Sequence, residues 1–327
     1  MAGFLCTRHI LDRYGDEIRA AAADGGVALD VILLPADPAE RLPAETLAGV
    51  EFSFFSGDVV PEYGRSYFAA TQGAPNLKWM HTMNAGLDNP VFGRLLAKGV
   101  TITTSSGSTA VPIAQTAIGG LLMLSRPFLA WGESQRRSAW EPREGRPPGD
   151  LATETLVVFG LGAIGREIAR LGRALGLHVI GVRRSPRAEG DPVDEMVTPA
   201  ALAEVLPRAN WLALACPLTD ETRGVIDAAA IGALPAGARI LNVARGEVID
   251  QEAMIAALRA GHLGGAYLDV TTPEPLPPDS PLWTLPNVII SPHNSAVASG
   301  NERRQVDMFL ANLRRWGRGE PMVNASS

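Results

Sequence analysis

Short apolar runs alternate with amphipathic stretches along the first hundred residues. Five runs have the length and the branched or aromatic side chains of strands, at residues 3–7, 28–35, 50–56, 77–82 and 99–105. Two stretches between them, residues 11–25 and 61–73, place apolar side chains at helical spacing. Because strands that alternate with helices pair in parallel, this pattern predicts an open α/β sheet.

A second α/β series follows. Its six strand-like runs lie at residues 155–160, 178–183, 211–216, 238–243, 265–270 and 287–291. Helical stretches such as residues 163–175 and 249–261 separate these runs. Six strands in this spacing predict a doubly wound parallel sheet, a Rossmann nucleotide-binding domain.

The last amphipathic stretch, residues 299–319, is expected to pack back on the first domain. At 327 residues the chain is too long for one compact core. We therefore expect residues 1–101 to form a smaller, discontinuous, flavodoxin-like α/β substrate domain and residues 102–290 the dinucleotide-binding domain. Residues 291–327 would return to the first domain, with a cleft between the two.

The longest apolar segment, residues 111–129, allows two interpretations. Its length is close to that of a membrane span, whereas Gln115, Arg126 and two prolines favour a buried crossover helix. We expect the helix and no membrane segment. A polar stretch rich in proline and glycine, residues 141–150, then leads into the second series.

The composition narrows the class of protein without identifying it. With 46% hydrophobic and 20% charged residues, the chain is typical of soluble globular proteins. A formal net charge of −6 argues against nucleic acid as a partner. Cys6 and Cys216 form neither a disulfide framework nor a metal-ligand cluster, and the N-terminus has no signal-peptide pattern. These features predict a cytoplasmic protein without a metal site.

A glycine-rich turn opens the second series. Gly160, Gly162 and Gly165 follow directly on its first strand-like run, with Ala163 and Ile164 between the last two glycines. The first glycine allows a tight turn, the second lets backbone N–H groups approach a pyrophosphate, and the third allows close helix–strand packing. A glycine-rich turn without a function is the alternative. The position between strand and helix favours a dinucleotide site, with the helix N-terminus at the phosphates.

The end of the next strand bears on the choice between NAD and NADP, because the residue there contacts the adenosine ribose. A site that prefers NAD would have an acid, whereas this sequence has Arg183, Arg184 and Ser185, with Arg187 nearby. With no carboxylate to repel a 2′-phosphate, two guanidinium groups can bind it through charge-assisted hydrogen bonds. A solvated basic loop is the alternative. The pattern favours NADP over NAD.

Three later strand-like runs are each followed by an ionisable residue, at the edge where open α/β sheets build their sites. Arg245 follows the fourth run, Asp269 and then Glu274 follow the fifth, and His293 follows the sixth. Singly, Arg245 could be a surface ion-pair partner, Glu274 a solvated acid and His293 a helix-cap residue. Their occurrence at successive strand ends favours a catalytic site.

The segments around these residues resemble the D-isomer-specific 2-hydroxyacid dehydrogenase family. The resemblance covers nearly the whole chain and rests on VVFGLGAIGREIA (157–169), CPLTDETRGVID (216–227), LPAGARILNVARGEVID (234–250), GAYLDVTTPEPLP (265–277) and SPHNSA (291–296). It implies that Arg245 binds the substrate, that Glu274 is paired with the catalytic base, and that His293 is that base. The segment 105–115 departs from the family pattern, so the identity of the substrate stays open.

The resemblance also implies contacts with the cofactor and the substrate. Asp269 would hold the nicotinamide carboxamide, and the remaining matches would line the cofactor site: Cys216, Pro217, Thr222 and Ala244. In the segment 83–88, backbone N–H groups would bind the substrate carboxylate at Asn84, Ala85 and Gly86.

These residue types suit the reduction of a small 2-keto acid to the D-2-hydroxy acid. Hydride transfer develops negative charge on the keto oxygen, and a histidine, which titrates near neutrality, can protonate it. A carboxylate beside His293 favours the protonated imidazole, and Arg245 can bridge the carboxylate and carbonyl oxygens of the substrate. Glyoxylate, hydroxypyruvate, pyruvate and bulkier 2-keto acids all stay open.

Two other classes of function occur on this fold: other dehydrogenases and nucleotide-sensing corepressors. Formate dehydrogenases, unlike this chain with Glu274, pair the catalytic histidine with glutamine; phosphite dehydrogenases belong to the same superfamily. Nucleotide-sensing corepressors retain similar residues, but basic tracts and appended tails are absent here.

The segment 111–129 and the arm around Trp140 resemble the family's dimer element and predict a homodimer. Trp140 could reach a partner's pocket or be a plain core or interface aromatic.

Overall fold

The computed structural model describes residues 1–87, 89–142 and 149–326, which divide into two compact units. Unit 1 comprises Met1–Ser108 and Ala298–Ser327, and unit 2 comprises Thr109–Val297. The predicted boundaries at 101 and 290 both lie earlier in the chain than the observed ones, which follow Ser108 and Val297. The first differs because residues 101–104 form a strand of the unit 1 sheet. The second differs because residues 291–295 are hydrogen-bonded to Asp269 within unit 2.

Unit 1 contains a sheet in the order β13-β5-β4-β3-β1-β2. Its parallel strands match the five predicted runs: β1 (Ala2–Cys6), β2 (Leu29–Leu33), β3 (Val50–Phe55), β4 (Trp79–Thr82) and β5 (Thr101–Thr104). Their order, 2-1-3-4-5, is flavodoxin-like, which confirms the predicted fold of this unit. The edge strand β13 (Ala325–Ser326), antiparallel to β5, is too short for a sequence pattern to reveal.

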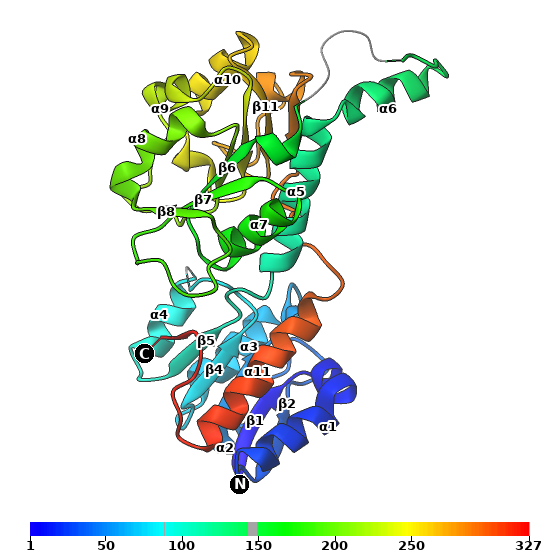
Figure 1. The fold of residues 1–327 in the computed structure, drawn as a ribbon. Helices are drawn as coiled ribbons and strands as arrows, with labels where there is room; N and C mark the ends of the chain where they lie inside the picture. The colour runs from blue at the N-terminus through cyan, green and yellow to red at the C-terminus, as the bar shows by residue number, and fades with distance from the viewer. Residues whose placement is uncertain (88, 143–148, 327) are drawn as a thin grey trace. The chain divides into compact units, whose positions relative to one another are not determined.

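Helices cover both faces of the unit 1 sheet. They are α1 (Arg8–Asp24), α2 (Ala44–Gly49), α3 (Gly64–Gly73), α4 (Pro90–Leu96) and α11 (Asn301–Gly317). α1 and α11 lie side by side on one face (Figure 1). There the rings of Phe4, Phe54 and Trp79 stack on Phe309 of α11. α3 and α4 bury their apolar side chains on the opposite face.

Unit 2 contains a parallel sheet in the order β12-β11-β10-β9-β6-β7-β8. The strands are β6 (Thr155–Phe159), β7 (His178–Val182), β8 (Glu195–Val197), β9 (Trp211–Leu214), β10 (Ala238–Asn242), β11 (Leu263–Leu268) and β12 (Val288–Ile290). From β8 to β11 the order is that of a Rossmann domain, 3-2-1-4-5-6, with β12 added, as the doubly wound pattern predicts. The three-residue β8 was not among the predicted strands. The strand order reverses between β6 and β9, where ligands of such sheets bind.

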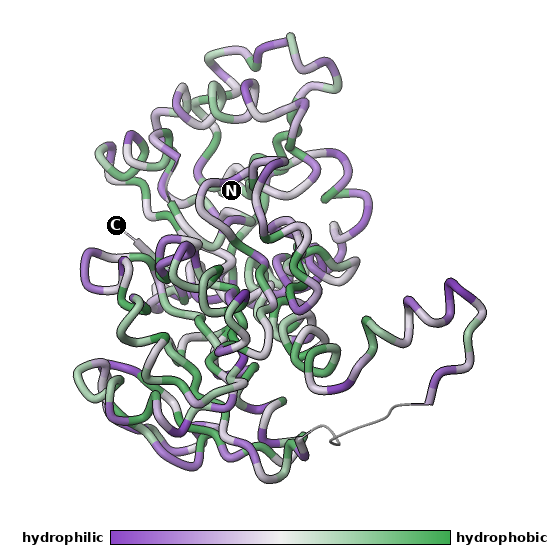
Figure 2. Tube along the Cα trace, turned by 90° about the horizontal axis from the view of Figure 1, so that it is seen from above, coloured by the Kyte–Doolittle hydropathy of each residue, from purple (hydrophilic) through white to green (hydrophobic). Residues whose placement is uncertain are grey.

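The helices of unit 2 also form two layers. α5 (Ala110–Ser125) and α7 (Ala163–Ala174) pack on one face of the sheet. α8 (Leu202–Val205), α9 (Ala228–Ala233) and α10 (Gln251–Arg259) pack on the other face. Hydrophilic and hydrophobic residues alternate along the chain trace (Figure 2).

The predicted crossover helix over residues 111–129 is shorter than expected. α5 ends at Ser125, and α6 (Phe128–Arg136) begins after a bend of 73°. Pro127 lacks an N–H donor and restricts Arg126 to extended backbone, at φ −126° and ψ 153°. α6 extends away from the sheet (Figures 1 and 2) and buries none of its own residues.

Within the described chain, no single helix is long and apolar enough to cross a membrane. α5 and α6 meet the criteria of length and composition only when they are taken together across their bend. Part of the arm that follows α6, residues 143–148, lies outside the described residues.

Candidate active site

The predicted glycine turn joins β6 to α7, and steric constraints explain why two of its positions are occupied by glycine. Gly160 has a φ of +99°, and a Cβ there would collide with the backbone of Cys216. A Cβ on Gly165 would collide with the carbonyl oxygen of Gly160. Gly162 precedes α7 and faces open space, because no described atom beyond its two chain neighbours lies within 4 Å of a Cβ built there.

The N-terminus of α7 can accept an anionic ligand. Gly162 supplies no side-chain cap, and the first turn, which begins with Ala163 and Ile164, contains no acidic residue. The first N–H groups of a helix have no partners within it, and the helix dipole adds partial positive charge. These donors, beside the open space at Gly162, fit the pyrophosphate of a dinucleotide.

The end of β7 differs from the prediction in one respect. Arg183 donates from Nη2 to Asp191 Oδ2 at 2.8 Å and from Nε to the carbonyl oxygen of Ser185 at 3.2 Å. Asp191, whose side chain is fully buried, also pairs with Arg166 of α7. Asp191 is therefore a carboxylate near these arginines that the sequence did not reveal, and it is already paired with two guanidinium groups. Arg184 and Ser185 are exposed.

The loop after β9 contacts the glycine turn through Cys216. Burial raises the pKa of the Cys216 thiol to about 11, so this group is protonated and inert near neutral pH. Thr222 Oγ1 donates to the carbonyl oxygen of Pro217 at 2.7 Å and thereby closes the loop. Ala244 is buried after β10, where its N–H donates to Asn242 Oδ1 at 3.0 Å. The Thr222 hydroxyl thus has a structural partner, and the cofactor contacts of this loop stay predictions.

His293 and Glu274 are brought into contact. His293 Nδ1 lies 2.9 Å from Glu274 Oε2, and Glu274 Oε1 accepts the N–H of Thr271 at 3.0 Å. His293 has a φ of +53°, which is uncommon outside glycine, and its N–H donates to the carbonyl oxygen of Asp269 at 2.8 Å. The two side chains are 54% and 38% exposed, so the pair is accessible to a small molecule.

Asp269 holds the loop that contains His293. Its Oδ1 accepts Ser291 Oγ at 2.7 Å and the N–H groups of Asn294 and Ser295 at 3.1 and 3.0 Å. Ser295 Oγ donates to the other carboxylate oxygen. Sequence reasoning missed Ser291 and Ser295, although both lie beside His293 in the family segment. The predicted carboxamide contact of Asp269 stays a prediction, because its carboxylate already accepts these four hydrogen bonds.

Arg245 follows β10, next to the loop that contains Glu274. A Cβ on Gly246 would collide with the carbonyl of Thr271, so the two loops are in direct contact. Asn242 Nδ2 donates to the carbonyl oxygen of Arg245 at 3.1 Å and fixes this backbone. The Arg245 side chain is exposed, with one hydrogen bond, from Nη1 to the Ala244 carbonyl oxygen at 2.7 Å, among the contacts of the described chain.

A cleft of about 520 Å³ lies beside His293 and Glu274. This volume is in the range typical of small-molecule sites. Polar and apolar side chains both line it: Asp269, Thr271, Glu274 and His293 on the one hand, and Pro275, Leu276, Trp283, Ile290 and Pro292 on the other.

The predicted substrate-carboxylate loop belongs to unit 1. The Asn84 N–H donates to Thr82 Oγ1 at 3.2 Å, and the Asn84 carbonyl oxygen accepts the Ser105 N–H at 2.9 Å. Below it, buried His81 contacts Thr103 Oγ1 at 2.7 Å, and burial lowers its pKa to about 3. His81 is therefore a neutral structural residue. The roles of Asn84, Ala85 and Gly86 stay predictions, and Asp88 lies outside the described residues.

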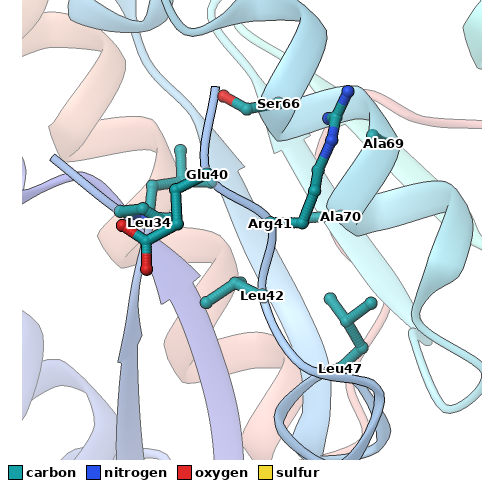
Figure 3. A pocket seen from close by; sticks show the side chains of 9 residues that line it. Leu34, Glu40, Arg41, Leu42, Leu47, Ser66, Ala69 and Ala70 are labelled. Atoms are coloured by element: carbon teal, nitrogen blue, oxygen red, sulfur yellow. The ribbon is translucent and has the colours of Figure 1, made fainter. Parts of the chain in front are cut away.

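A smaller hollow in unit 1 is unsuited to the reaction (Figure 3). Leu34, Leu42 and Leu47 surround it together with Arg41. Its volume of about 60 Å³ is much smaller than the 520 Å³ of the cleft beside His293, and no histidine is among its lining residues in the described chain.

The fold and the site together define a class of protein. A Rossmann unit with an open glycine turn, and a histidine–carboxylate pair at the carboxyl ends of its strands, are the parts of a dinucleotide-dependent oxidoreductase. Residues 118–295 match the family model of the D-isomer specific 2-hydroxyacid dehydrogenase, NAD binding domain. The chain belongs to this family.

Individual proteins support the assignment. The glyoxylate reductase of Aeropyrum pernix is 30% identical over 258 residues, which cover 77% of this chain and 76% of that protein. A D-isomer specific 2-hydroxyacid dehydrogenase from Xanthobacter autotrophicus, in complex with NADPH and MES, is 30% identical, with a TM-score of 0.72 and coverage of 100% and 98%. An NADPH-dependent glyoxylate/hydroxypyruvate reductase from Sinorhizobium meliloti, in complex with NADP and sulfate, is 26% identical, with a TM-score of 0.71 and the same coverage. The chain is thus an oxidoreductase that uses NAD or NADP.

Proposed function

We propose that this protein reduces a small 2-keto acid of the glyoxylate and hydroxypyruvate type to the D-2-hydroxy acid. The observation that carries the proposal is the 2.9 Å contact between His293 Nδ1 and Glu274 Oε2 at the edge of a cleft. A histidine held by a carboxylate is an acid–base group, and the exposed Arg245 at the end of β10 offers a guanidinium to an acidic substrate. The Sinorhizobium meliloti relative supports the substrate class.

The chemistry divides among three side chains. Hydride comes from the nicotinamide when it is bound. Glu274 engages Nδ1 of His293, which leaves Nε2 to give a proton to the keto oxygen as negative charge develops there. Arg245 binds the substrate carboxylate and polarises the carbonyl. Ala85 and Gly86 keep their proposed role as backbone donors to the carboxylate, whereas the Asn84 N–H already donates to Thr82 Oγ1.

A substrate panel tests the proposal. We expect NADPH-dependent reduction of glyoxylate or hydroxypyruvate, because His293, held by Glu274, can supply the proton that this direction needs. The panel should contain pyruvate and bulkier 2-keto acids, with formate and phosphite tested against the oxidised cofactors, and should be ranked by kcat/KM. Turnover of formate or phosphite alone would favour those dehydrogenases, and binding without turnover would favour a nucleotide sensor.

We expect a preference for NADPH over NADH. The exposed Arg184 and Ser185 can bind a 2′-phosphate, and a charge-assisted hydrogen bond supplies about 1.5–3 kcal/mol. The preference should therefore be about tenfold or more. Steady-state KM values for both cofactors measure it, and equal values would contradict the prediction.

We also propose a homodimer built on α5 and α6, with a second copy of the chain as the partner. Phe128 and Trp131 are 49% and 46% exposed, and Trp140 is 95% exposed. Apolar rings of this size on a surface typically mark an interface. Light scattering should give twice the 34.6 kDa of one chain, and the double variant Phe128→Ser, Trp131→Ser should shift the mass toward one chain. A single-chain mass for the parent protein at micromolar concentration would refute the dimer.

We place the activity in the cytoplasm. Cys6 and Cys216 are free and buried, and neither has a disulfide partner among the described residues. Free thiols are typical of a reducing compartment.

A further inference from the structure

The loop after β7 contains a buried ion-pair cluster that the proposed reaction does not use. The Asp191 side chain is fully buried between Arg166 of α7 and Arg183. Its Oδ2 accepts Arg183 Nη2 at 2.8 Å and the N–H of Ala188 at 2.6 Å. Its Oδ1 accepts Arg166 Nη1 and, at 3.3 Å, Arg183 Nη1. Because Arg166 also donates to the carbonyl oxygen of Gly190, the cluster ties the loop to the helix that begins at the glycine turn.

Arg183 has few donors left for a ligand. Besides its two bonds to Asp191, it donates from Nε to the Ser185 carbonyl oxygen at 3.2 Å and from Nη2 to the Pro186 carbonyl oxygen at 2.5 Å. Its side chain is 19% exposed. A guanidinium has five N–H donors, and a phosphate is bound best by two of them in parallel. Arg183 can offer such a pair only by giving up a loop contact.

Arg184 is in the opposite situation. It is exposed and has no hydrogen-bond or ion-pair partner in residues 1–87, 89–142 and 149–326. Arg184 lies two residues after Val182, the last residue of β7, whose carbonyl oxygen accepts the Gly160 N–H at 3.0 Å. Arg184 therefore follows a strand end that borders the glycine turn, which is predicted to bind the cofactor.

We propose that Asp191 sets the cofactor selectivity by holding Arg183 in the loop, so that Arg184 is the guanidinium that binds the 2′-phosphate of NADPH. The proposal rests on the proposed preference for NADPH, and it separates two arginines that the sequence treats as equivalent. Arg183 and Asp191 are positioning residues, and Arg184 is the binding residue.

Dissociation constants of NADP⁺ and NAD⁺, measured by calorimetry on the full chain, test this division. Arg184→Ala should weaken NADP⁺ binding about tenfold or more and leave NAD⁺ within about twofold, because the lost contact involves only the 2′-phosphate. Arg183→Ala should weaken both cofactors by a similar factor, because it loosens the loop. Asp191→Asn should tighten NADP⁺ by roughly threefold or more with NAD⁺ little changed, because it removes a negative charge and releases Arg183.

Glu189→Gln is the matched control, because it removes a negative charge from an exposed position of the same loop. It should leave the ratio of the two constants unchanged. If Arg183→Ala abolishes the selectivity while Arg184→Ala keeps it, or if Asp191→Asn weakens NADP⁺ alone, the proposal is overturned.

The binding measurements still decide the proposal if one variant does not fold or if the proposed reaction is wrong. If Arg183→Ala does not fold, Arg184→Ala still decides the matter, because Arg184 has no hydrogen bond or ion pair to lose within the described chain. Binding of the oxidised cofactors needs no keto acid, so a failure of the proposed reaction leaves the selectivity measurements intact.

Discussion

Replacing His293 by alanine should lower kcat for keto-acid reduction by roughly 10²–10⁴-fold, the usual contribution of a general acid. His293 Nε2 is the proton donor in the proposed reaction, and no other described histidine contacts Glu274. Binding of NADPH should be nearly unchanged, because the His293 side chain is not among the predicted cofactor contacts. Steady-state kinetics and cofactor titration measure the two effects separately.

A matched histidine variant distinguishes catalysis from a general loss of structure. His178 begins β7, at the opposite end of the strands from His293, and pairs with the surface acid Glu195 at 2.7 Å. His178→Ala should therefore keep kcat close to the parent value. A His293→Ala enzyme with kcat within about threefold of the parent would show that another group supplies the proton.

The contact between His293 and Glu274 could be anticipated from the sequence because it depends on strand ends. Arg245, Glu274 and His293 follow the runs that form β10, β11 and β12, and these strands are neighbours in the sheet. Parallel strands have their carboxyl ends at one edge, so the order of apolar runs is enough to place the loops near one another. The glycine turn was predictable for a similar reason, since Gly160 and Gly165 meet backbone that any βαβ unit brings close.

The contacts that the sequence did not reveal are made by irregular segments. Asp191 is eight residues from Arg183 in a loop without helix or strand, and no periodicity relates it to Arg183 or Arg166. Ser291 and Ser295 bind Asp269 because of the local backbone around His293. Hydrophobic patterning specifies which faces are buried, but it does not specify the conformation of loops, which depends on individual hydrogen bonds.

Replacing Glu274 by glutamine should lower kcat for reduction by roughly tenfold or more. His293 gives a proton to the keto oxygen in the proposed reaction, and Glu274 Oε2, 2.9 Å from His293 Nδ1, holds the imidazole by a charge-assisted hydrogen bond. Glutamine removes the negative charge, so this hydrogen bond becomes weaker. Cofactor binding should change little, so the loss should appear in kcat rather than in the KM for NADPH.

Steady-state kcat for reduction measures this effect, and the geometry supplies its control. Glutamine can still accept the Thr271 N–H through its carbonyl oxygen, so the loop should keep its shape while the charge is lost. Asp279→Asn removes a charge from an exposed position later in the same segment and should leave kcat unchanged. A Glu274→Gln enzyme with the kcat of the parent would show that Glu274 is a solvated loop acid. His293 would then work without it, and the proposed acid–base pair would have to be abandoned.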